Sequence, residues 1–153
     1  IRDFASALEY YKKVEAIQPE NHNILFYAGS CLAELERYEE ALQYFFKLDF
    51  IESNCIKAWR AIGWCSFVNG KYEQAMKYYE KILVSKPLAA DYLNAGHVAW
   101  RTGKIEKAAE LYSKAALEYG GQEIFREMFG KDKETLVRQG ISEKDIPLMM
   151  DLV

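Results

Sequence analysis

The apolar residues of this chain recur in steps of three and four along most of its length. Leu42, Phe45 and Leu48 form one such run, and their spacing is that of one face of an α-helix. No segment alternates apolar and polar residues with the turn chemistry that strands require. The pattern predicts an all-α chain, with a single helix at about 3–17, then three helix pairs, then two or three shorter helices.

A pattern of small and aromatic residues repeats at intervals of 34 and then 33 positions. Its phases are Gly29, Gly63 and Gly96; Ala7, Ala41, Ala75 and Ala108; and Tyr11, Phe45, Tyr79 and Tyr112. A period of this length indicates stacked units, none of which can bury its apolar face alone. We expect the small residues to let two antiparallel helices approach closely, while the aromatic residues fill the space between them.

Short turns are expected between the helices of each pair. Asn69-Gly70-Lys71 and Thr102-Gly103-Lys104 have the composition of such turns, in which glycine supplies a positive φ after a helix end. The first full unit departs from this pattern, because Glu36 stands where the other units have glycine.

The repeat resembles the tetratricopeptide repeat (TPR). One unit carries Trp59, Ile62, Gly63, Gly70, Tyr72, Ala75, Tyr79, Ile82 and Pro87. The next carries Tyr92, Ala95, Gly96, Gly103, Ile105, Ala108, Tyr112, Ala115 and Gly120. The first full unit carries Leu25, Ala28, Gly29, Tyr38, Ala41, Phe45 and Leu48, and it departs at Glu36 and Ser53.

The resemblance implies a helix-turn-helix solenoid that coils into a right-handed superhelix and ends in a short helical C-terminal cap. The expected division is a TPR array at 1–120, with a half repeat at 1–19 and full repeats at about 22–53, 56–87 and 89–120, followed by a tail at 121–153. The resemblance also extends to bacterial TPR proteins of unknown function. The last part of the chain is similar to their C-terminal repeat blocks.

The segment after Gly121 lacks the repeat signal and is predicted to form separate helices. We expect one at Gln122–Phe129, a second capped by Asp132 and closed by Gly140, and a last one that begins at Asp145. The apolar content of the last helix predicts that the tail docks. It either caps the end of the solenoid or folds back across its groove.

The charge and the apolar segments exclude some partners. The formal net charge of −3 is too small to predict nucleic acid or a membrane surface as a partner. RNA binding through aromatic residues stays an alternative, weakened by the lack of dense lysine and arginine stripes. No apolar run approaches 18 residues, so we expect no membrane insertion.

The three cysteines are interpreted as small buried residues. Their number is odd and no C-x-x-C motif occurs, which argues against a disulfide framework or a zinc site. Cys31 and Cys65 share one repeat phase, and Cys55 lies between units. Free thiols indicate, weakly, a cytoplasmic location.

No catalytic motif accompanies the two histidines, His22 and His97. We therefore expect no enzymatic activity, no metal and no cofactor. The function expected instead is a scaffold that binds a protein or peptide partner.

The resemblance places the binding groove on the first helix of each pair, along its inner, concave side. At these phases stand Arg60, Trp64, Phe67, His97, Trp100 and Arg101, which we predict to form a peptide-binding site. Aromatic residues beside arginine are typical of binding hot spots, and such a site suits a peptide with apolar and acidic side chains. The alternative interpretation is that these aromatic residues pack against neighbouring repeats or the tail.

A second functional hypothesis is that the chain is a TPR arm of a larger enzyme or sensor and recruits substrates to a domain absent here. The chain begins midway through a unit and without Met, so we expect it to be a piece of a longer protein. Phe4, Leu8 and Tyr11 would then lack the first helix that normally covers part of them, which predicts upstream repeats or self-association through this N-terminal edge.

Overall fold

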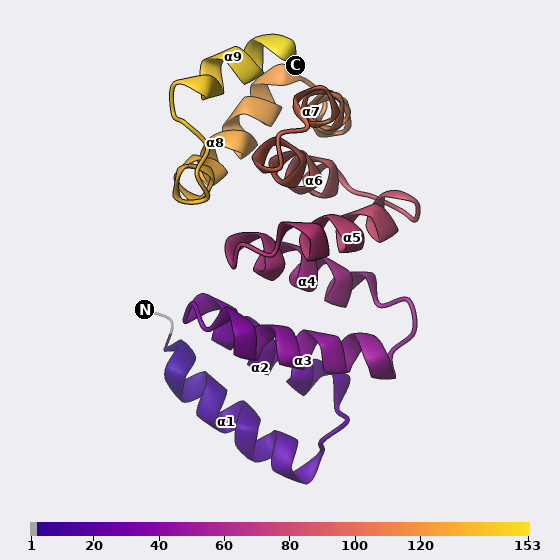
Figure 1. Ribbon diagram of the computed structural model, residues 1–153. Coiled ribbons are helices and arrows are strands. Elements are labelled where there is room, and N and C mark those ends of the chain that lie inside the picture. The colour runs from indigo at the N-terminus through magenta and orange to yellow at the C-terminus, as the bar shows by residue number, and fades with distance from the viewer. Residues whose placement is uncertain (1–2) are drawn as a thin grey trace. The chain divides into compact units, whose positions relative to one another are not determined.

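The computed structural model describes residues 3–153, which form α-helices joined by short turns and no strand (Figure 1). The helices are α1 (Phe4–Ile17), α2 (His22–Glu34), α3 (Tyr38–Ile51), α4 (Ile56–Val68), α5 (Tyr72–Leu83), α6 (Ala89–Arg101), α7 (Ile105–Tyr119), α8 (Gln122–Arg138) and α9 (Asp145–Leu152). The predicted all-α fold and the order of a single helix, helix pairs and terminal helices are confirmed. The chain divides into two compact units, one ending at Asn69 (unit 1) and one beginning at Gly70 (unit 2).

In both units an aromatic ring lies directly against a glycine of the preceding helix. A methyl group added at Gly29 would lie 2.7 Å from the ring of Phe45, and one added at Gly96 would lie 2.5 Å from the ring of Tyr112. Real side chains do not tolerate such distances, so only glycine fits. The close approach that the repeat predicted is confirmed at these two positions.

The turns between helices use left-handed residues. Gly70 and Gly103 have φ values of 78° and 80°, as predicted. Glu36 adopts the same conformation at 56°, although it carries a side chain. Its N–H donates to the carbonyl of Ala33 and the next N–H donates to Leu32, both at 2.9 Å. These two bonds end α2 in a Schellman motif and hold Glu36 in a conformation that favours glycine.

Unit 1 has its core between α2, α3 and α4, where Leu25, Leu48, Ala58 and Cys55 are buried together. Trp59 is buried as well, and its indole N–H donates to Asp49 Oδ1 at 2.7 Å, which satisfies the polar end of the ring. α1 packs on α2. Tyr44 of α3 donates its hydroxyl to Glu15 of α1 at 3.1 Å.

The first helix leaves a smaller apolar edge than predicted. Leu8 is buried, and Phe4 and Tyr11 are half-buried. α2 packs on α1 and covers Leu8, so the apolar surface left at this edge comes from Phe4 and Tyr11. Self-association through this edge stays a prediction.

In unit 2, α8 is one continuous helix, so the predicted break between Phe129 and Asp132 is wrong. A glycine inside a helix costs about 1 kcal/mol relative to alanine. Gly130 therefore weakens α8 without ending it. Phe125, Phe129 and Leu136 lie on one face of the continuous helix and are all buried. The free energy gained by burying these side chains offsets the cost of the glycine. The predicted end at Gly140 is confirmed by its φ of 97°.

α9 begins at Asp145, as predicted, and docks only in part. Met149 is its one buried residue. Gln122 at the start of α8 donates its side-chain amide to the carbonyl of Val153 at 3.3 Å. Leu148 and Leu152 stay exposed. In unit 2 the tail therefore covers α6 and α7 through α8, with α9 on its outer side (Figure 1).

Replacement of glycine by alanine should have opposite effects at Gly96, which lies against a ring, and at Gly130, which does not. Gly96→Ala should destabilise the protein by about 1–3 kcal/mol, because the new methyl group overlaps the Tyr112 ring. Gly130→Ala has open space around it in the middle of α8 and should stabilise by about 0.5–1 kcal/mol. Urea unfolding of both variants measures the difference. Equal stability of Gly96→Ala and the wild type would show that the ring does not rest on this glycine.

The conformation of Glu36 predicts a stabilising substitution. Glu36→Gly should raise the free energy of unfolding by about 0.5–1 kcal/mol, since the left-handed penalty exceeds the extra backbone entropy of glycine. Glu36→Ala is the matched control, because it removes the carboxylate and keeps the Cβ atom. The backbone explanation fails if alanine stabilises the protein as much as glycine does.

Candidate functional site

The two first helices of unit 1, α2 and α4, form a face that combines aromatic rings with positive charge. The ammonium group of Lys57 in α4 lies 3.8 Å from the centroid of the Phe26 ring and 5.7 Å from that of Tyr27, both in α2. Arg60 and Trp64 follow Lys57 at helical spacing and share its side of α4. We call the surface of these five residues and Asn23 the α2–α4 face.

A hollow opens at one end of the α2–α4 face. Its volume is about 300 Å³, and it is lined by His22, Asn23, Phe26, Leu48, Glu52, Asn54, Cys55, Ile56 and Lys57. At its rim His22 Nδ1 and Glu52 Oε2 are 2.8 Å apart, and both side chains are about half-exposed. The floor is apolar and the rim is charged, so the hollow can accept an apolar side chain of a bound peptide.

Aromatic contacts continue from this face to α1. The centroids of Tyr27 and Tyr11 are 5.6 Å apart, as are those of Tyr11 and Tyr10. Tyr10 and Tyr27 are exposed, at 62% and 43%. The three tyrosines therefore extend the aromatic surface beyond the predicted positions. Sequence reasoning assigned Tyr11 to packing and did not consider Tyr10 or Tyr27.

Of the three site residues predicted in unit 1, two reach the surface. Arg60 and Trp64 are half-buried, whereas Phe67 is completely buried. The Trp64 and Phe67 rings are 5.7 Å apart, so Phe67 supports Trp64 from within the protein. The expectation that Phe67 itself contacts a peptide is corrected, because its side chain has no exposed surface.

In unit 2, His97 is buried and hydrogen-bonded on both sides. Its Nδ1 accepts the Tyr112 hydroxyl proton at 2.8 Å, and its Nε2–H donates to Asp132 Oδ2 of α8 at 3.1 Å. This pattern belongs to the neutral imidazole. Burial lowers the pKa of His97, although the hydrogen bond and charge of Asp132 oppose the shift. Burial likewise raises the pKa of Tyr112 well above its ordinary value, and Asp132 adds to this.

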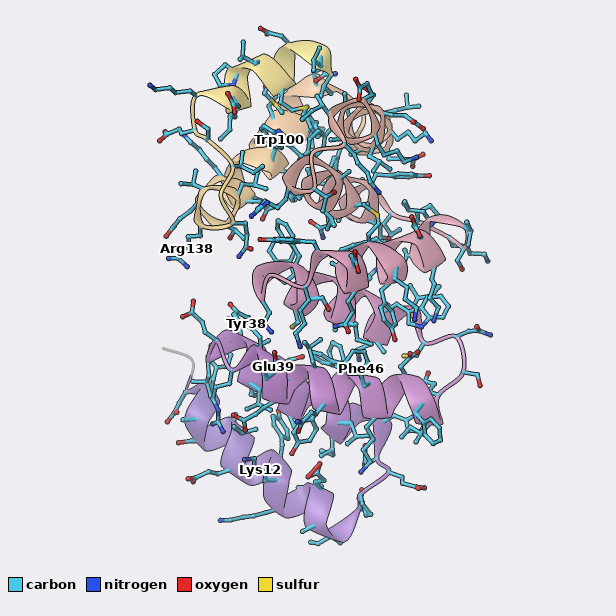
Figure 2. The ribbon with its side chains drawn as sticks, in the orientation of Figure 1. Lys12, Tyr38, Glu39, Phe46, Trp100 and Arg138 are labelled. Atoms are coloured by element: carbon cyan, nitrogen blue, oxygen red, sulfur yellow. The ribbon has the colours of Figure 1, made fainter. Side chains whose placement is uncertain are left out.

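Trp100 is covered by the helices of unit 2 rather than presented to a ligand. Figure 2 shows it among α6, α7 and α8. Its ring centroid is 6.3 Å from those of Tyr112 and Phe129, and only 6% of the residue is exposed. His97 and Trp100 are therefore corrected from peptide contacts to packing residues. The interpretation of these aromatic residues as packing against the tail is the one that holds here.

Arg101 fastens the C-terminal end of α8. Its guanidinium lies 4.7 Å from the centroid of the Tyr72 ring, and its Nε–H donates to the carbonyl of Gln139. The Tyr72 hydroxyl donates to the side chain of the same glutamine at 2.7 Å. A cation at a helix C-terminus also interacts favourably with the helix dipole. These contacts lie within unit 2, and the peptide-binding role of Arg101 stays a prediction.

The three thiols are buried and free. Burial raises the pKa of Cys65 to about 12, and burial together with Glu34 raises that of Cys31. Because the thiolate is the reactive form, both side chains are poor nucleophiles near neutral pH. Their predicted burial is confirmed.

Two further kinds of site are missing from the part of the chain that the structure describes. Residues 3–153 contain no cluster of three or more histidine, cysteine or acidic side chains that could hold a metal ion. Across the same range, no helix combines the length and apolar content needed to cross a membrane.

Comparison with known proteins identifies the repeat. Family models described as tetratricopeptide repeat match residues 2–65, 56–87 and 92–117, which together make up most of the chain. No curated protein matches the sequence.

Several solved structures share the fold. MamA 41-end from Desulfovibrio magneticus RS-1 has a TM-score of 0.73 and 22% identity, covering 97% of this chain and 85% of that chain. PilF from Pseudomonas aeruginosa has a TM-score of 0.64 and 21% identity, covering 94% and 70%. A tetratricopeptide repeat protein from Parabacteroides merdae ATCC 43184 has a TM-score of 0.60 and 18% identity, covering 98% and 64%. At these identities the likeness concerns the fold alone.

The buried imidazole predicts a specific pH dependence of stability. Because the folded-state pKa of His97 lies below the unfolded-state value of about 6.5, stability is full above pH 6.5. It falls as the pH drops toward the folded-state pKa, by up to about 1.4 kcal/mol per pH unit. Urea unfolding between pH 7.5 and 5.5 should show this slope in the wild type and a flatter one in His97→Gln.

A His22→Gln variant is the control for that experiment, since it replaces the exposed histidine and leaves the Tyr112–His97–Asp132 network intact. Identical pH slopes for the wild type and His97→Gln would show that the network does not hold a neutral imidazole.

Proposed function

Because the chain belongs to the tetratricopeptide repeat family, we propose that it is a protein-interaction scaffold whose α2–α4 face binds a peptide with apolar and acidic side chains. The observation that carries the proposal is the position of the Lys57 ammonium over Phe26 and beside Tyr27. A peptide carboxylate that reaches Lys57 would at the same time bring neighbouring apolar side chains onto both rings. TPR solenoids are in general non-catalytic and bind protein partners.

The composition of the face favours a peptide of this kind. Lys57 and Arg60 supply positive charge at the surface, and Trp64 supplies a partly exposed aromatic ring that Phe67 holds in place. Tryptophan and arginine dominate the binding energy of many interfaces. The α2–α4 face thus combines positive charges that can bind carboxylates with aromatic rings whose burial against a ligand is favourable.

The hollow beside Phe26 provides a place for one anchoring side chain. Its volume of about 300 Å³ is ample for a leucine or phenylalanine, and its floor includes the buried Leu48. An apolar side chain inserted there is removed from water, while the charged rim stays hydrated. Burial of one such side chain contributes about 1.5–3 kcal/mol.

The proposed site keeps Arg60 and Trp64 from the six residues predicted by repeat phase. Phe67 acts as their support. His97, Trp100 and Arg101 are engaged by α8 within unit 2, so the proposal does not use them. A cytoplasmic location belongs to the proposal on the basis of the three free thiols alone.

The test is selection of ligands from a random library of 12-residue displayed peptides on the immobilised full chain. Enriched peptides should carry aspartate or glutamate next to apolar residues. Trp64→Ala should weaken binding of a selected peptide about 30-fold or more, as expected for a hot spot of about 2 kcal/mol. Lys57→Glu should weaken it about tenfold at low salt, since it reverses the charge that steers the carboxylate.

Phe50→Ala is the matched control, because Phe50 is an aromatic residue on α3 that is 89% exposed and lies outside the α2–α4 face. It should leave the affinity unchanged. Thermal unfolding of each variant separates loss of binding from loss of structure. The proposal fails if selected peptides lack acidic residues, or if Phe50→Ala weakens them as much as Trp64→Ala does.

A further inference from the structure

Two consecutive glycines connect α7 to α8 in unit 2. Gly120 and Gly121 have φ values of 91° and 144°, and a methyl group added at either would meet no atom within 4 Å. Their N–H groups are bonded to the last turn of α7, so α7 keeps its end while the backbone bonds after them can rotate. No side chain caps the start of α8. The connection therefore has the properties of a hinge.

Beyond this hinge, α8 and α9 are tied to each other at both ends. Lys133 Nζ of α8 lies 2.8 Å from Glu143 Oε1, in the loop that leads to α9. At the other end, the side-chain amide of Gln122 donates to the carbonyl of Val153 at 3.3 Å. The two helices can therefore move as one body. We call residues 122–153 the α8–α9 cover.

The α8–α9 cover lies on a buried aromatic cluster of α6 and α7. The ring centroids of Phe125 and Phe129 are 5.8 and 5.5 Å from that of Tyr112, and Phe129 is 6.3 Å from Trp100. Leu136, further along α8, is buried as well. Trp100 is 6% exposed and Tyr112 is completely buried, so solvent reaches these rings only when the cover moves.

One of the polar contacts that hold the cover closed responds to acid. The contact of Arg101 with the carbonyl of Gln139 does not, because a guanidinium stays charged at all relevant pH values. The contact of His97 with Asp132 does. Protonation turns His97 Nδ1 from an acceptor into a donor, so the imidazolium can no longer accept the Tyr112 hydroxyl proton.

The direction of the effect follows from burial. In the closed form, burial lowers the pKa of His97 and outweighs the opposing hydrogen bond and charge of Asp132. An imidazole that opening exposes to water regains the ordinary value of about 6.5. Above pH 6.5 the closed form is therefore fully favoured, and below it opening takes up one proton. The opening equilibrium should rise by up to about tenfold per pH unit toward the lowered pKa.

The remaining groups around the network do not titrate in this range. The other titratable or charged groups on the helices around it are Asp91, Arg101, Tyr119, Lys131 and Lys133. Side chains of these four types do not ordinarily change charge between pH 5.5 and 7.5. Burial raises the pKa of Tyr119, and the charges of Asp132 and Asp91 raise it further. His97 is thus the acid-sensitive group under the cover.

We propose that the α8–α9 cover is a lid that acid releases. When His97 takes up a proton, the cover turns at Gly120 and Gly121 as one body and exposes Trp100, while α6 and α7 stay folded. The repeat phase predicts a ligand at His97, Trp100 and Arg101, and the open form makes these side chains accessible. Acid therefore controls access to the positions that α8 covers in the closed form.

The experiment is amide hydrogen exchange of the full chain, read by mass spectrometry at pH 6.5 and 5.5 and corrected for the intrinsic effect of pH on exchange. The protection of α8 amides should fall by about three- to tenfold between the two pH values. At both values, α8 should be at least about tenfold less protected than the most protected amides of α6 and α7, because the cover opens before those helices do.

Three variants identify the group that takes up the proton. His97→Gln keeps one donor and one acceptor but cannot titrate, so α8 should be equally protected at both pH values. Asp132→Asn keeps an acceptor for the neutral imidazole and removes the charge that favours the imidazolium, so its response should be at least as large as that of the wild type. His22→Gln, which replaces the exposed histidine of unit 1, should respond as the wild type does.

The proposal is wrong if α8 is as protected as α6 and α7, because unit 2 then opens only as a whole. It is also wrong if α8 protection is the same at both pH values in the wild type. A response that persists in His97→Gln, or that disappears in Asp132→Asn, would assign the effect to the carboxyl group instead. No peptide enters this experiment, so its outcome is independent of the function proposed for the α2–α4 face.

Discussion

The contact between an aromatic ring and a glycine backbone sets the geometry of each unit. Where Phe45 rests on Gly29 and Tyr112 rests on Gly96, two helices approach more closely than any side chain on the glycine would permit. The interior of a protein has little spare volume, so every neighbouring side chain is placed relative to that ring. In unit 1 the ring of Phe45 lies 5.9 Å from Phe26 and thereby supports the α2–α4 face.

The equivalent ring in unit 2 supports a different structure. Tyr112 contacts His97, Trp100, Phe125 and Phe129, with ring centroids between 5.5 and 6.3 Å apart. Two of these four residues belong to α8. The same repeat position therefore lies beneath a partly exposed surface in unit 1 and beneath a surface covered by α8 in unit 2. Whether the surface is exposed depends on the helix that packs over the ring and not on the identity of the ring.

This difference explains what the sequence could predict. Helices and turns follow from short spacings along the chain, and the close glycine contacts join residues within one repeat, Gly29 with Phe45 and Gly96 with Tyr112. Periodicity therefore reports them directly. Glu36 shows that even a departure from the repeat keeps its conformation, because the two hydrogen bonds that end α2 do not depend on the side chain. The burial of His97 and Trp100 depends instead on Phe129 and Asp132, which lie about 30 positions further on and outside the repeat. The prediction of two helices on either side of Gly130 divided the continuous apolar face of α8 that makes this contact.

The buried polar network gives α8 its register. Phe125, Phe129 and Leu136 supply the apolar area, but apolar packing tolerates small shifts along a helix. The hydrogen bond from His97 to Asp132 does not, since a displaced helix would leave a buried imidazole without its acceptor and cost about 1–3 kcal/mol. Arg101 adds a second fixed point at the carbonyl of Gln139. Together the two polar contacts hold α8 at its middle, where Asp132 lies, and at its C-terminal end, where Gln139 lies.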